Sequence, residues 1–234
     1  QIGFLASLLV CLLKPSPELL AVESLEWGLD SPSEVVGTSN IQYARVSKGV
    51  LGGGAAWDPH FSLRCPKEGF DAAHMSALTV RMYSSADADL LDVYYGSPDG
   101  RWCLGGKLFV RKGWATYRLD LSKNNWRETT AGDVSKQWGG PAKRVSAFRL
   151  DPGNQAERWL LIDLVCIGPV PPGFVEGVTV EPRGTAKIKS LRTPKTVEAG
   201  DKLSVSAEFE VSAPVGLTKG TVFLRLKQGA AVMR

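Results

Sequence analysis

The 234-residue chain has little of what most catalytic and metal-binding signatures require. It contains only two histidines, His60 and His74, and neither lies beside a recognisable nucleophile motif. Its four cysteines have neither the spacing of a zinc site nor the density of a disulfide framework. The three glycines at positions 52–54 are not followed by the Gly-Lys-Ser/Thr of a phosphate-binding loop, so we interpret them as a turn or a close backbone approach.

Helical patterning is also lacking outside the extreme N-terminus, where residues 2–13 form an apolar run. The 25 glycines and 14 prolines supply many turn positions, which favours short strands over long helices. The hydrophobic fraction of 44% and the charged fraction of 22% are those of an ordinary globular protein. The sequence therefore predicts an all-β fold.

Positive charge is not concentrated where a nucleic acid could bind. The formal net charge is +4, and basic residues outnumber acidic ones only in residues 178–234. The larger part of the chain has no basic patch of the kind that phosphate binding needs. We therefore expect no nucleic-acid partner.

The apolar run at residues 2–13 is too short to span a bilayer comfortably and has the length of an export signal. We expect residues 1–23 to be a signal peptide, with a buried helix of the fold as the alternative, and we expect no stable membrane span. This predicts a secreted or cell-envelope protein.

Alternating apolar positions predict the strands of one large domain. In residues 77–84, Leu78, Val80 and Met82 share one face, and residues 114–121 alternate in the same way. Residues 145–167 read as two strands joined by an Asp-Pro-Gly-Asn turn, that is, as a hairpin closing the domain. Its second strand is apolar on both faces, which predicts a central strand covered on both sides. Asp163 interrupts that strand, and we expect it to pair with an arginine or with backbone donors because an isolated buried charge is too costly.

The domain organisation follows from a change of composition near residue 168. We expect one domain over residues 24–168, a Pro/Gly linker at 169–177 and a second β domain from 178 to 234. Only about 57 residues remain there, fewer than the roughly 100 of an immunoglobulin-type sandwich, so we expect that domain to be partial.

An ordered set of motifs carries a resemblance to a known family. In chain order they are Trp27, the Gly-Val-Leu-Gly turn at 49–52, Asp58-Pro59, Gly-Trp-x-x-Tyr-x-x-Asp-Leu at 113–121, Trp138-Gly139, Phe-Arg-Leu-Asp-Pro at 148–152 and Ile-Asp-x-Val at 162–165. Together they resemble the galactose-binding-like jelly-roll modules of secreted bacterial polysaccharide-degrading proteins. The tail resembles the start of an immunoglobulin-like domain.

The resemblance implies an antiparallel β-sandwich of jelly-roll type that binds a glycan on loops or on a sheet face, in some members with a structural calcium ion. No other cofactor is expected. Sugar rings stack on aromatic faces, and amide or guanidinium groups bind paired hydroxyls. We expect Trp27, Trp114, Trp138 and Trp159 to pack in the core and the other three tryptophans to be exposed. The predicted carbohydrate-binding residues are Trp57, Trp102, Asn124, Asn125, Trp126 and Arg127.

Three functions remain open at this point. The first is a non-catalytic carbohydrate-binding accessory module of a larger secreted or cell-surface protein, whose partners are a polysaccharide and downstream domains, including a glycoside hydrolase. The second is a structural or protein-interaction sandwich of the cell envelope. The third is a β-sandwich lyase or hydrolase, although the sequence offers no carboxylate pair that turns and capping do not explain equally well.

Overall fold

The computed structural model describes residues 24–47, 49–130, 135–182, 185–192, 206–212, 227–228 and 231–232. These residues form antiparallel strands and two short 3-10 turns, with no α-helix among them, so the predicted all-β class is confirmed. None of these residues forms a helix long and apolar enough to cross a membrane. The chain divides into two compact units, Gln1–Thr179 and Val180–Arg234. The predicted signal peptide at residues 1–23 lies outside the described residues.

The first unit is built on one curled antiparallel sheet. Its elements are β1 (Leu25–Trp27), η1 (Pro32–Glu34), β2 (Val35–Val46), β3 (Leu51–Leu63), β4 (Phe70–Asp71), β5 (Ala77–Ser84), β6 (Leu90–Gly96), β7 (Trp102–Phe109), β8 (Gly113–Asp120), η2 (Leu121–Lys123), β9 (Trp126–Glu128), β10 (Ser135–Lys136), β11 (Arg144–Val145), β12 (Ala147–Pro152), β13 (Arg158–Gly168) and β14 (Gly177–Val180). The strand order in the sheet is β10-β9-β7-β6-β12-β3-β13-β5-β8-β14, with β1 beside β13 and β2 beside β3.

Strand β3 divides this sheet into two halves. Residues 51–55 of β3 pair with β13, whereas residues 61–63 pair with β12. Asp58, between the two segments, has a positive φ of 54°, an unusual backbone conformation for a residue other than glycine. We call β13, β5, β8 and β14 with the first segment of β3 the β5 half, and β12, β6, β7, β9 and β10 with the second segment the β6 half.

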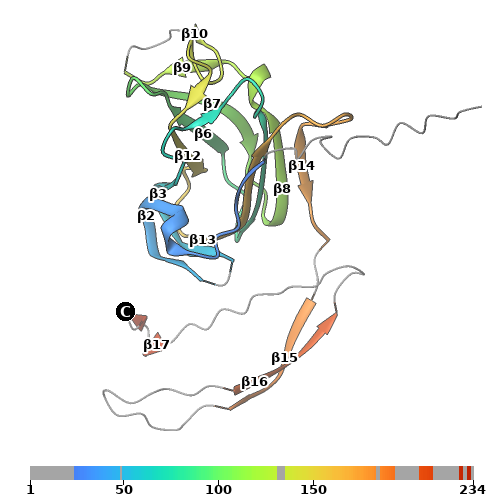
Figure 1. Cartoon of the computed structure of the whole chain (residues 1–234). Helices are drawn as coiled ribbons and strands as arrows, with labels where there is room; N and C mark the ends of the chain where they lie inside the picture. The colour runs from blue at the N-terminus through green and yellow to red at the C-terminus, as the bar shows by residue number, and fades with distance from the viewer. Residues whose placement is uncertain are drawn as a thin grey trace, which may run out of the picture. The chain divides into compact units, whose positions relative to one another are not determined.

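The two halves pack face to face around one hydrophobic core. Figure 1 shows β6, β7 and β12 on one side of the curl and β8 and β14 on the other. Trp27 of β1 stacks on Phe148 of β12, with ring centroids 5.8 Å apart. The alternation predicted for residues 77–84 and 114–121 is confirmed, since Val80, Met82, Tyr117 and other inward residues of β5 and β8 are buried in this core.

The predicted closing hairpin at residues 145–167 is wrong. β12 and β13 are separate strands as expected, but β3 lies between them and pairs with both. The Asp-Pro-Gly-Asn segment therefore crosses from one half of the sheet to the other. The buried guanidinium of Arg158 stabilises this connection by donating hydrogen bonds to the carbonyl oxygens of Pro152, Gly153 and Gln155.

β13 is the central strand that its composition predicted, but the predicted covering of both its faces is wrong, because Trp159, Asp163 and Cys166 on its outer face are only half-buried. It pairs with β3, β5 and β1, and its inward residues Leu160, Ile162 and Val165 are fully buried. The expected pairing of Asp163 is also confirmed, because its carboxylate forms an ion pair with Arg81 of β5. Asp163 occupies a bulge where the register with β5 shifts between Ile162 and Leu164.

The four tryptophans expected in the core divide into two groups. Trp27 and Trp138 are buried there, as predicted. Trp114 and Trp159 are only half-buried and lie outside the core cluster, on the outer face of the β5 half. The core prediction was therefore wrong for these two, since the alternation of β8 and β13 turns both side chains outward.

The second unit shows less structure among its described residues. β15 (Thr185–Arg192) pairs with β16 (Ser206–Ser212), and β17 (Lys227–Gln228) pairs with β18 (Ala231–Val232). These two small antiparallel sheets agree with a β unit, but an immunoglobulin-like domain is not shown by them.

Candidate functional site

The outer face of the β6 half gathers the polar and aromatic side chains that point away from the core. Alternate residues of five neighbouring strands lie on it. They are His60 and Ser62 of β3, Arg149 and Asp151 of β12, Asp92 and Tyr94 of β6, Trp102 and Leu104 of β7, and Arg127 of β9. We call this surface the Tyr94 face.

Its centre is an arginine held between an aromatic ring and a carboxylate. Arg149 is directly opposite Tyr94 in the register of β12 and β6, and its guanidinium carbon lies 4.5 Å from the centre of the Tyr94 ring. Nε and Nη2 of Arg149 donate to the two carboxylate oxygens of Asp151, each at 2.6 Å. This paired geometry fixes the plane of the guanidinium.

Burial raises the pKa of two groups at this centre, Tyr94 and Asp151. It raises the pKa of Tyr94 to about 12, helped by the negative charges of Asp151 and Asp92, so the phenol keeps its proton at neutral pH. Burial also raises the pKa of Asp151, although the hydrogen bonds and charge of Arg149 offset part of the rise. Asp151 in turn raises the pKa of Arg149 against the effect of burial. We take the pair to be ionic at neutral pH because both Asp151 oxygens accept from the guanidinium.

A row of titratable groups crosses the face beside this pair. Asp92 of β6 is opposite Asp151 in register, and His60 follows on the other side, on β3. Nδ1 of His60 is buried and has no hydrogen-bond partner among the described residues. Because this nitrogen is buried, it is not a contact point for a ligand on the face, and only the exposed part of the His60 ring belongs to the surface.

Trp102 places a second aromatic ring on the face. It is opposite Gly96 in the β6–β7 register, and its six-membered ring lies 3.6 Å from where a Cβ of residue 96 would be. Tyr94 is the preceding outward residue of β6, so the two aromatic residues are diagonal neighbours, roughly 7–8 Å apart between Cα atoms. This is an ordinary van der Waals distance, whereas a Cβ there would come within 2.9 Å of the Ala147 side chain. The indole is half-buried, although the sequence predicted it to be exposed.

Three of the sequence-predicted residues lie on or beside this face. Trp102 and Arg127 are on it, with Arg127 opposite Leu104 in the β7–β9 register. Trp57 borders it beside Asp58, and 69% of its surface is exposed, as the sequence predicted. The charge of Asp58 acts on both Arg149 and Asp151, which places this bend of β3 close to the centre of the face.

The predicted exposure of Trp126 is wrong. Only 1% of its surface is exposed, its Nε1 donates to the carbonyl of Leu121 at 2.8 Å, and its ring packs against Tyr95 and Trp138. Gly105 makes room for the indole, because a Cβ there would come within 2.7 Å of it. Trp126 thus belongs to the core in this structure and cannot stack on a ligand.

The remaining predicted residues, Asn124 and Asn125, lie just before β9. Asn125 is exposed, and half-buried Asn124 donates to the carbonyl of Asp120, 3.4 Å away. Both asparagines precede β9, whereas Arg127 lies within it on the Tyr94 face. Of residues 124–127, Asn125 and Arg127 are thus exposed, whereas Trp126 between them is buried in the core.

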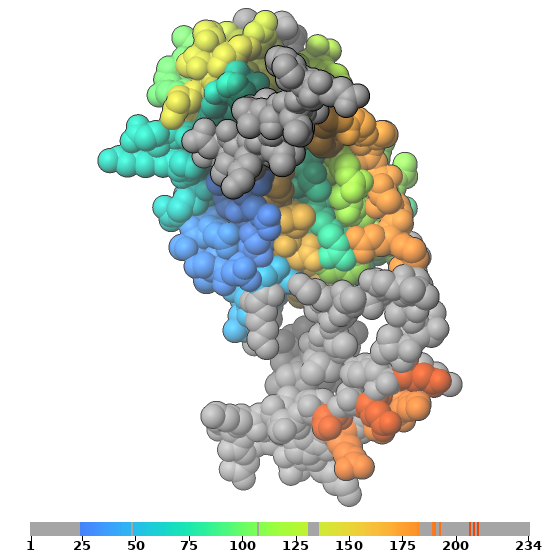
Figure 2. Space-filling view, turned by 45° about the vertical axis from the view of Figure 1, so that its right-hand side comes forward, coloured from blue at the N-terminus to red at the C-terminus, as the bar shows by residue number. Residues whose placement is uncertain are grey.

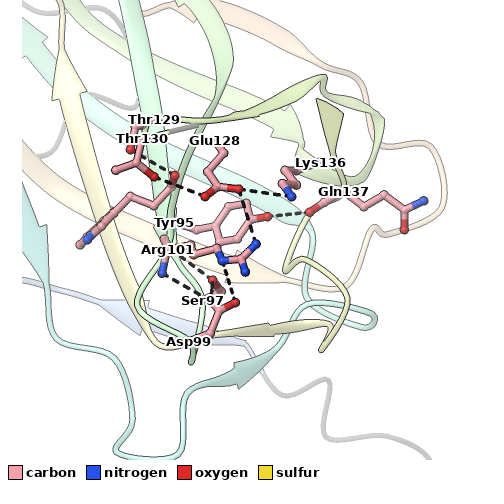
Figure 3. Close-up of polar contacts among 10 residues, drawn as sticks. Tyr95, Ser97, Asp99, Arg101, Glu128, Thr129, Thr130, Lys136 and Gln137 are labelled. Atoms are coloured by element: carbon pink, nitrogen blue, oxygen red, sulfur yellow. Dashed lines mark hydrogen bonds and ion pairs between the residues drawn. The ribbon is translucent and has the colours of Figure 1, made fainter. Parts of the chain in front are cut away.

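A network of ionic contacts fixes the edge of the sheet next to Trp102 and Arg127 (Figure 3). Glu128 of β9 is buried and pairs with Lys136 of β10 at 3.2 Å and with Arg101 at 3.7 Å. Arg101 also contacts Asp99 at 3.2 Å. The hydroxyl of Tyr95 donates to the carbonyl of Gln137 at 2.7 Å, which attaches the loop after β10 to β6.

The sequence did not indicate Tyr94, Arg149, Asp151 or His60 as site residues. They come from three strands, β3, β6 and β12; Arg149 and Asp151 are two residues apart on β12, but only the order of strands brings them beside Tyr94 and His60. The available signal was the alternation of residues 90–95 and 147–151, which places Asp92 with Tyr94 and Arg149 with Asp151 on one face of each strand.

No group of three or more His, Cys, Asp or Glu side chains in the described part of the chain is arranged to hold a metal ion. Asp92, Asp151 and His60 lie near one another, but both oxygens of Asp151 accept hydrogen bonds from Arg149.

Comparison with known proteins gives only distant structural likenesses. No protein-family model matches the chain, and no curated protein matches it. Among solved structures, a family 29 carbohydrate-binding module is similar over 66% of this chain and 93% of its own, with a TM-score of 0.41 and 13% identity. The family 11 carbohydrate-binding module of a Clostridium thermocellum cellulosomal cellulase is similar over 65% of this chain and 90% of its own, with a TM-score of 0.35 and 11% identity. Both likenesses are low in score and identity, so neither assigns a family or a ligand to this chain.

Proposed function

We propose that the first unit is a non-catalytic carbohydrate-binding module of jelly-roll type, and that its glycan lies on the Tyr94 face. The observation that carries this proposal is the fixed Tyr94–Arg149–Asp151 group with Trp102 beside it. It combines aromatic surface with a guanidinium whose plane is set before any ligand arrives.

The chemistry of this group suits a pyranose ring. The apolar C–H surface of a sugar packs on aromatic rings such as Trp102, and its hydroxyl groups need directional donors and acceptors. Nη1 of Arg149 is not used in the bonds to Asp151, so its two N–H groups can face a ligand. The phenol of Tyr94, which keeps its proton, supplies one further donor. Preorganised side chains lower the entropy cost of binding.

The charges of the face favour a neutral glycan over a polyanion. Arg149 and Asp151 neutralise each other, and of the two negative charges of Asp58 and Asp92 nearby, the exposed Arg127 on the same face offsets only one. A polyuronate would meet these carboxylates with like charge, which disfavours binding. We therefore propose a neutral polysaccharide as the ligand.

The same geometry speaks against glycosidase chemistry at this place. A glycosidase needs one carboxyl group to donate a proton and a second to act as base or nucleophile. Asp92 and Asp151 face each other in register, but both oxygens of Asp151 are engaged by Arg149. A carboxylate held in this way is poorly placed to exchange protons with a substrate.

The wider setting of the module also belongs to this proposal. We propose that it serves a larger secreted or cell-surface glycan-degrading protein, with residues 1–23 acting as the export signal. The second unit would then act as an immunoglobulin-like spacer toward further domains. The length and apolar character of residues 2–13 and the Pro/Gly segment at 169–177 support this arrangement.

Affinity electrophoresis of the full chain tests the proposal. Gels containing cellulose derivatives, xylan, glucomannan, β-glucan or polygalacturonate are compared, and we expect retardation by at least one neutral polysaccharide. Trp102→Ala should lower the affinity at least about tenfold, which corresponds to about 1.4 kcal/mol. Tyr43→Ala is the matched control, because Tyr43 is an exposed aromatic residue of β2 outside the face.

Two results would overturn the proposal. The first is an absence of retardation on every glycan, which would favour the structural or protein-interaction alternative. The second is a Trp102→Ala variant that binds as well as the Tyr43→Ala control. Cleavage of a glycan by the chain would instead revive the enzymatic alternative.

A further inference from the structure

The outer face of the β5 half carries a second group of aromatic and charged side chains. They are Arg81 and Tyr83 of β5, Trp114 and Thr116 of β8, and Trp159, Leu161 and Asp163 of β13. We call this surface the Trp114 face. Figure 2 shows parts of β2 (blue), β13 (gold), β8 (green) and β14 (orange) on this side of the molecule. In the sheet, β3 lies between β2 and β13, and β5 lies between β13 and β8.

The geometry at its centre repeats the arrangement on the Tyr94 face. The guanidinium carbon of Arg81 lies 4.4 Å from the centre of the Trp114 ring, and Arg81 forms an ion pair with Asp163. Tyr83 is opposite Trp114 in register, and the two ring centroids are 5.9 Å apart at 55°. Each face therefore has an arginine that stacks on an aromatic ring and is anchored by an aspartate.

Core packing does not account for these rings. Tyr83, Trp114 and Trp159 are all half-buried and lie outside the core cluster, which is filled by inward neighbours such as Met82 and Ala115. Three large aromatic residues on the outer face of three adjacent strands are thus left partly open to solvent. Tyr and Trp in such positions are typical of binding surfaces.

The neighbouring strand β3 extends this surface without adding side chains to it. Gly52 and Gly54 face outward beside Leu161 and Trp159 of β13. A Cβ at position 52 would come within 2.9 Å of the Leu161 side chain, whereas the nearest atom to a Cβ at position 54 would be 3.9 Å away. The backbone at Gly54 is therefore bare next to Trp159, which leaves a flat strip beside the aromatic residues.

From these observations we infer that the Trp114 face is a second saccharide platform, which binds a neutral polysaccharide independently of the Tyr94 face. The inference rests on the proposed function for its class of ligand. Arg81 and Asp163 neutralise each other, Tyr83, Trp114 and Trp159 offer ring surface, and the Thr116 hydroxyl lies beside Arg81 in register. These are the groups that a neutral pyranose requires.

The position of the platform has a functional consequence. The inner faces of the two halves pack against each other, so their outer faces point away from each other. One module could therefore bind two polysaccharide chains at once. Such bivalent attachment raises the effective affinity for a polymer far above that of one platform.

Isothermal titration of the full chain with cellohexaose, xylohexaose and mannohexaose tests the inference. With whichever hexasaccharide binds, we expect two molecules per chain for the wild type. We expect one for Trp114→Ala, one for Trp102→Ala, and none for the double variant. Tyr83→Ala serves as a second variant of the Trp114 face if Trp114→Ala does not fold. Phe109→Ala, at an exposed aromatic residue of β7 in the β6 half, serves as the control for this face, and Tyr43→Ala remains the control for the Tyr94 face.

The outcomes distinguish this inference from the proposed function. If the wild type binds one hexasaccharide and Trp102→Ala abolishes binding, the second platform is overturned while the proposed function stands. If Trp114→Ala removes all binding and Trp102→Ala removes none, the platform stands and the Tyr94 face is overturned as the site. If no hexasaccharide binds to the wild type, both ideas fail.

Discussion

The two outer faces of the sheet carry the same three kinds of side chain, but they bury the carboxylate to different depths. On the Tyr94 face the side chain of Asp151 is 3% exposed, whereas on the Trp114 face that of Asp163 is 17% exposed. The two arginines are equally accessible, with 25% exposure for Arg149 and 26% for Arg81. We therefore expect the ion pair of the Tyr94 face to contribute more to the free energy of unfolding than the ion pair of the Trp114 face.

The difference in depth has a cause in the strands. Asp151 lies within β12, opposite Asp92 of β6, and is covered on its outer side by Arg149, whose guanidinium lies on Tyr94. Asp163 lies at a bulge of β13, where the ladder with β5 is interrupted. A bulge locally changes the direction of a side chain, which accounts for the greater exposure of Asp163. The comparison suggests that the Tyr94 face is the more rigid of the two.

The largest expected effect on stability is that of Arg149→Ala. This change leaves the Asp151 carboxylate buried without its charged partner, and the expected loss of unfolding free energy is about 3 kcal/mol at pH 7. Urea denaturation of the full chain, followed by tryptophan fluorescence, measures it. A loss below about 1 kcal/mol would show that solvent reaches Asp151 and that the two faces do not differ as described.

Arg81→Ala should cost less, about 1 kcal/mol, because the more exposed Asp163 can be hydrated once its partner is gone. The same denaturation experiment gives this value, and Asp163→Asn should be comparable. A cost equal to that of Arg149→Ala would remove the distinction between the faces. An Asp163→Asn variant as stable as the wild type would contradict a structural role for this ion pair.

The smallest expected effect is a difference in pH dependence between the wild type and Asp151→Asn. Burial raises the pKa of folded Asp151 above its unfolded value of about 3.9, despite the opposing effect of Arg149. A carboxyl group with a raised folded pKa contributes stability below the unfolded pKa, and that contribution is lost as pH rises through the folded pKa. The stability of the wild type relative to Asp151→Asn should therefore fall as pH increases from about 4.

Denaturation midpoints between pH 3.5 and pH 7 would measure this slope. A wild-type advantage that grows with pH would mean that the attraction of Arg149 outweighs the cost of burying Asp151. That result would mean that the deeper burial of Asp151 does not distinguish the Tyr94 face from the Trp114 face.

Local patterns in the sequence were sufficient to predict the strands with clear alternation or a long apolar run, namely β5, β8 and β13. The alternation at 77–84 and 114–121 matches the burial of β5 and β8 because side chains on a strand point to opposite faces in turn. The apolar run at 159–167 indicated a central strand, and the cost of a buried charge indicated a partner for Asp163. Both inferences needed only the chemistry of neighbouring residues.

Long-range placement could not be read in the same way. Residues 145–167 look like a hairpin, but β3, nearly a hundred residues earlier, lies between the two strands. Trp126 follows two asparagines in a segment that resembles a surface loop, yet Gly105 of β7 provides the space that buries it. The residues of a segment do not by themselves indicate that β3 lies between β12 and β13, or that Trp126 is buried.

The sequence by itself thus determined the all-β class and, for clearly alternating segments such as 77–84 and 114–121, the strand and the direction of its side chains, because these depend on a period of two residues along one segment. Only the tertiary structure decided the order of strands. That order brings Arg149 over Tyr94 and Arg81 over Trp114, on opposite sides of one core. The physical reason is that strand pairing joins distant segments through backbone hydrogen bonds, which every residue except proline can both donate and accept.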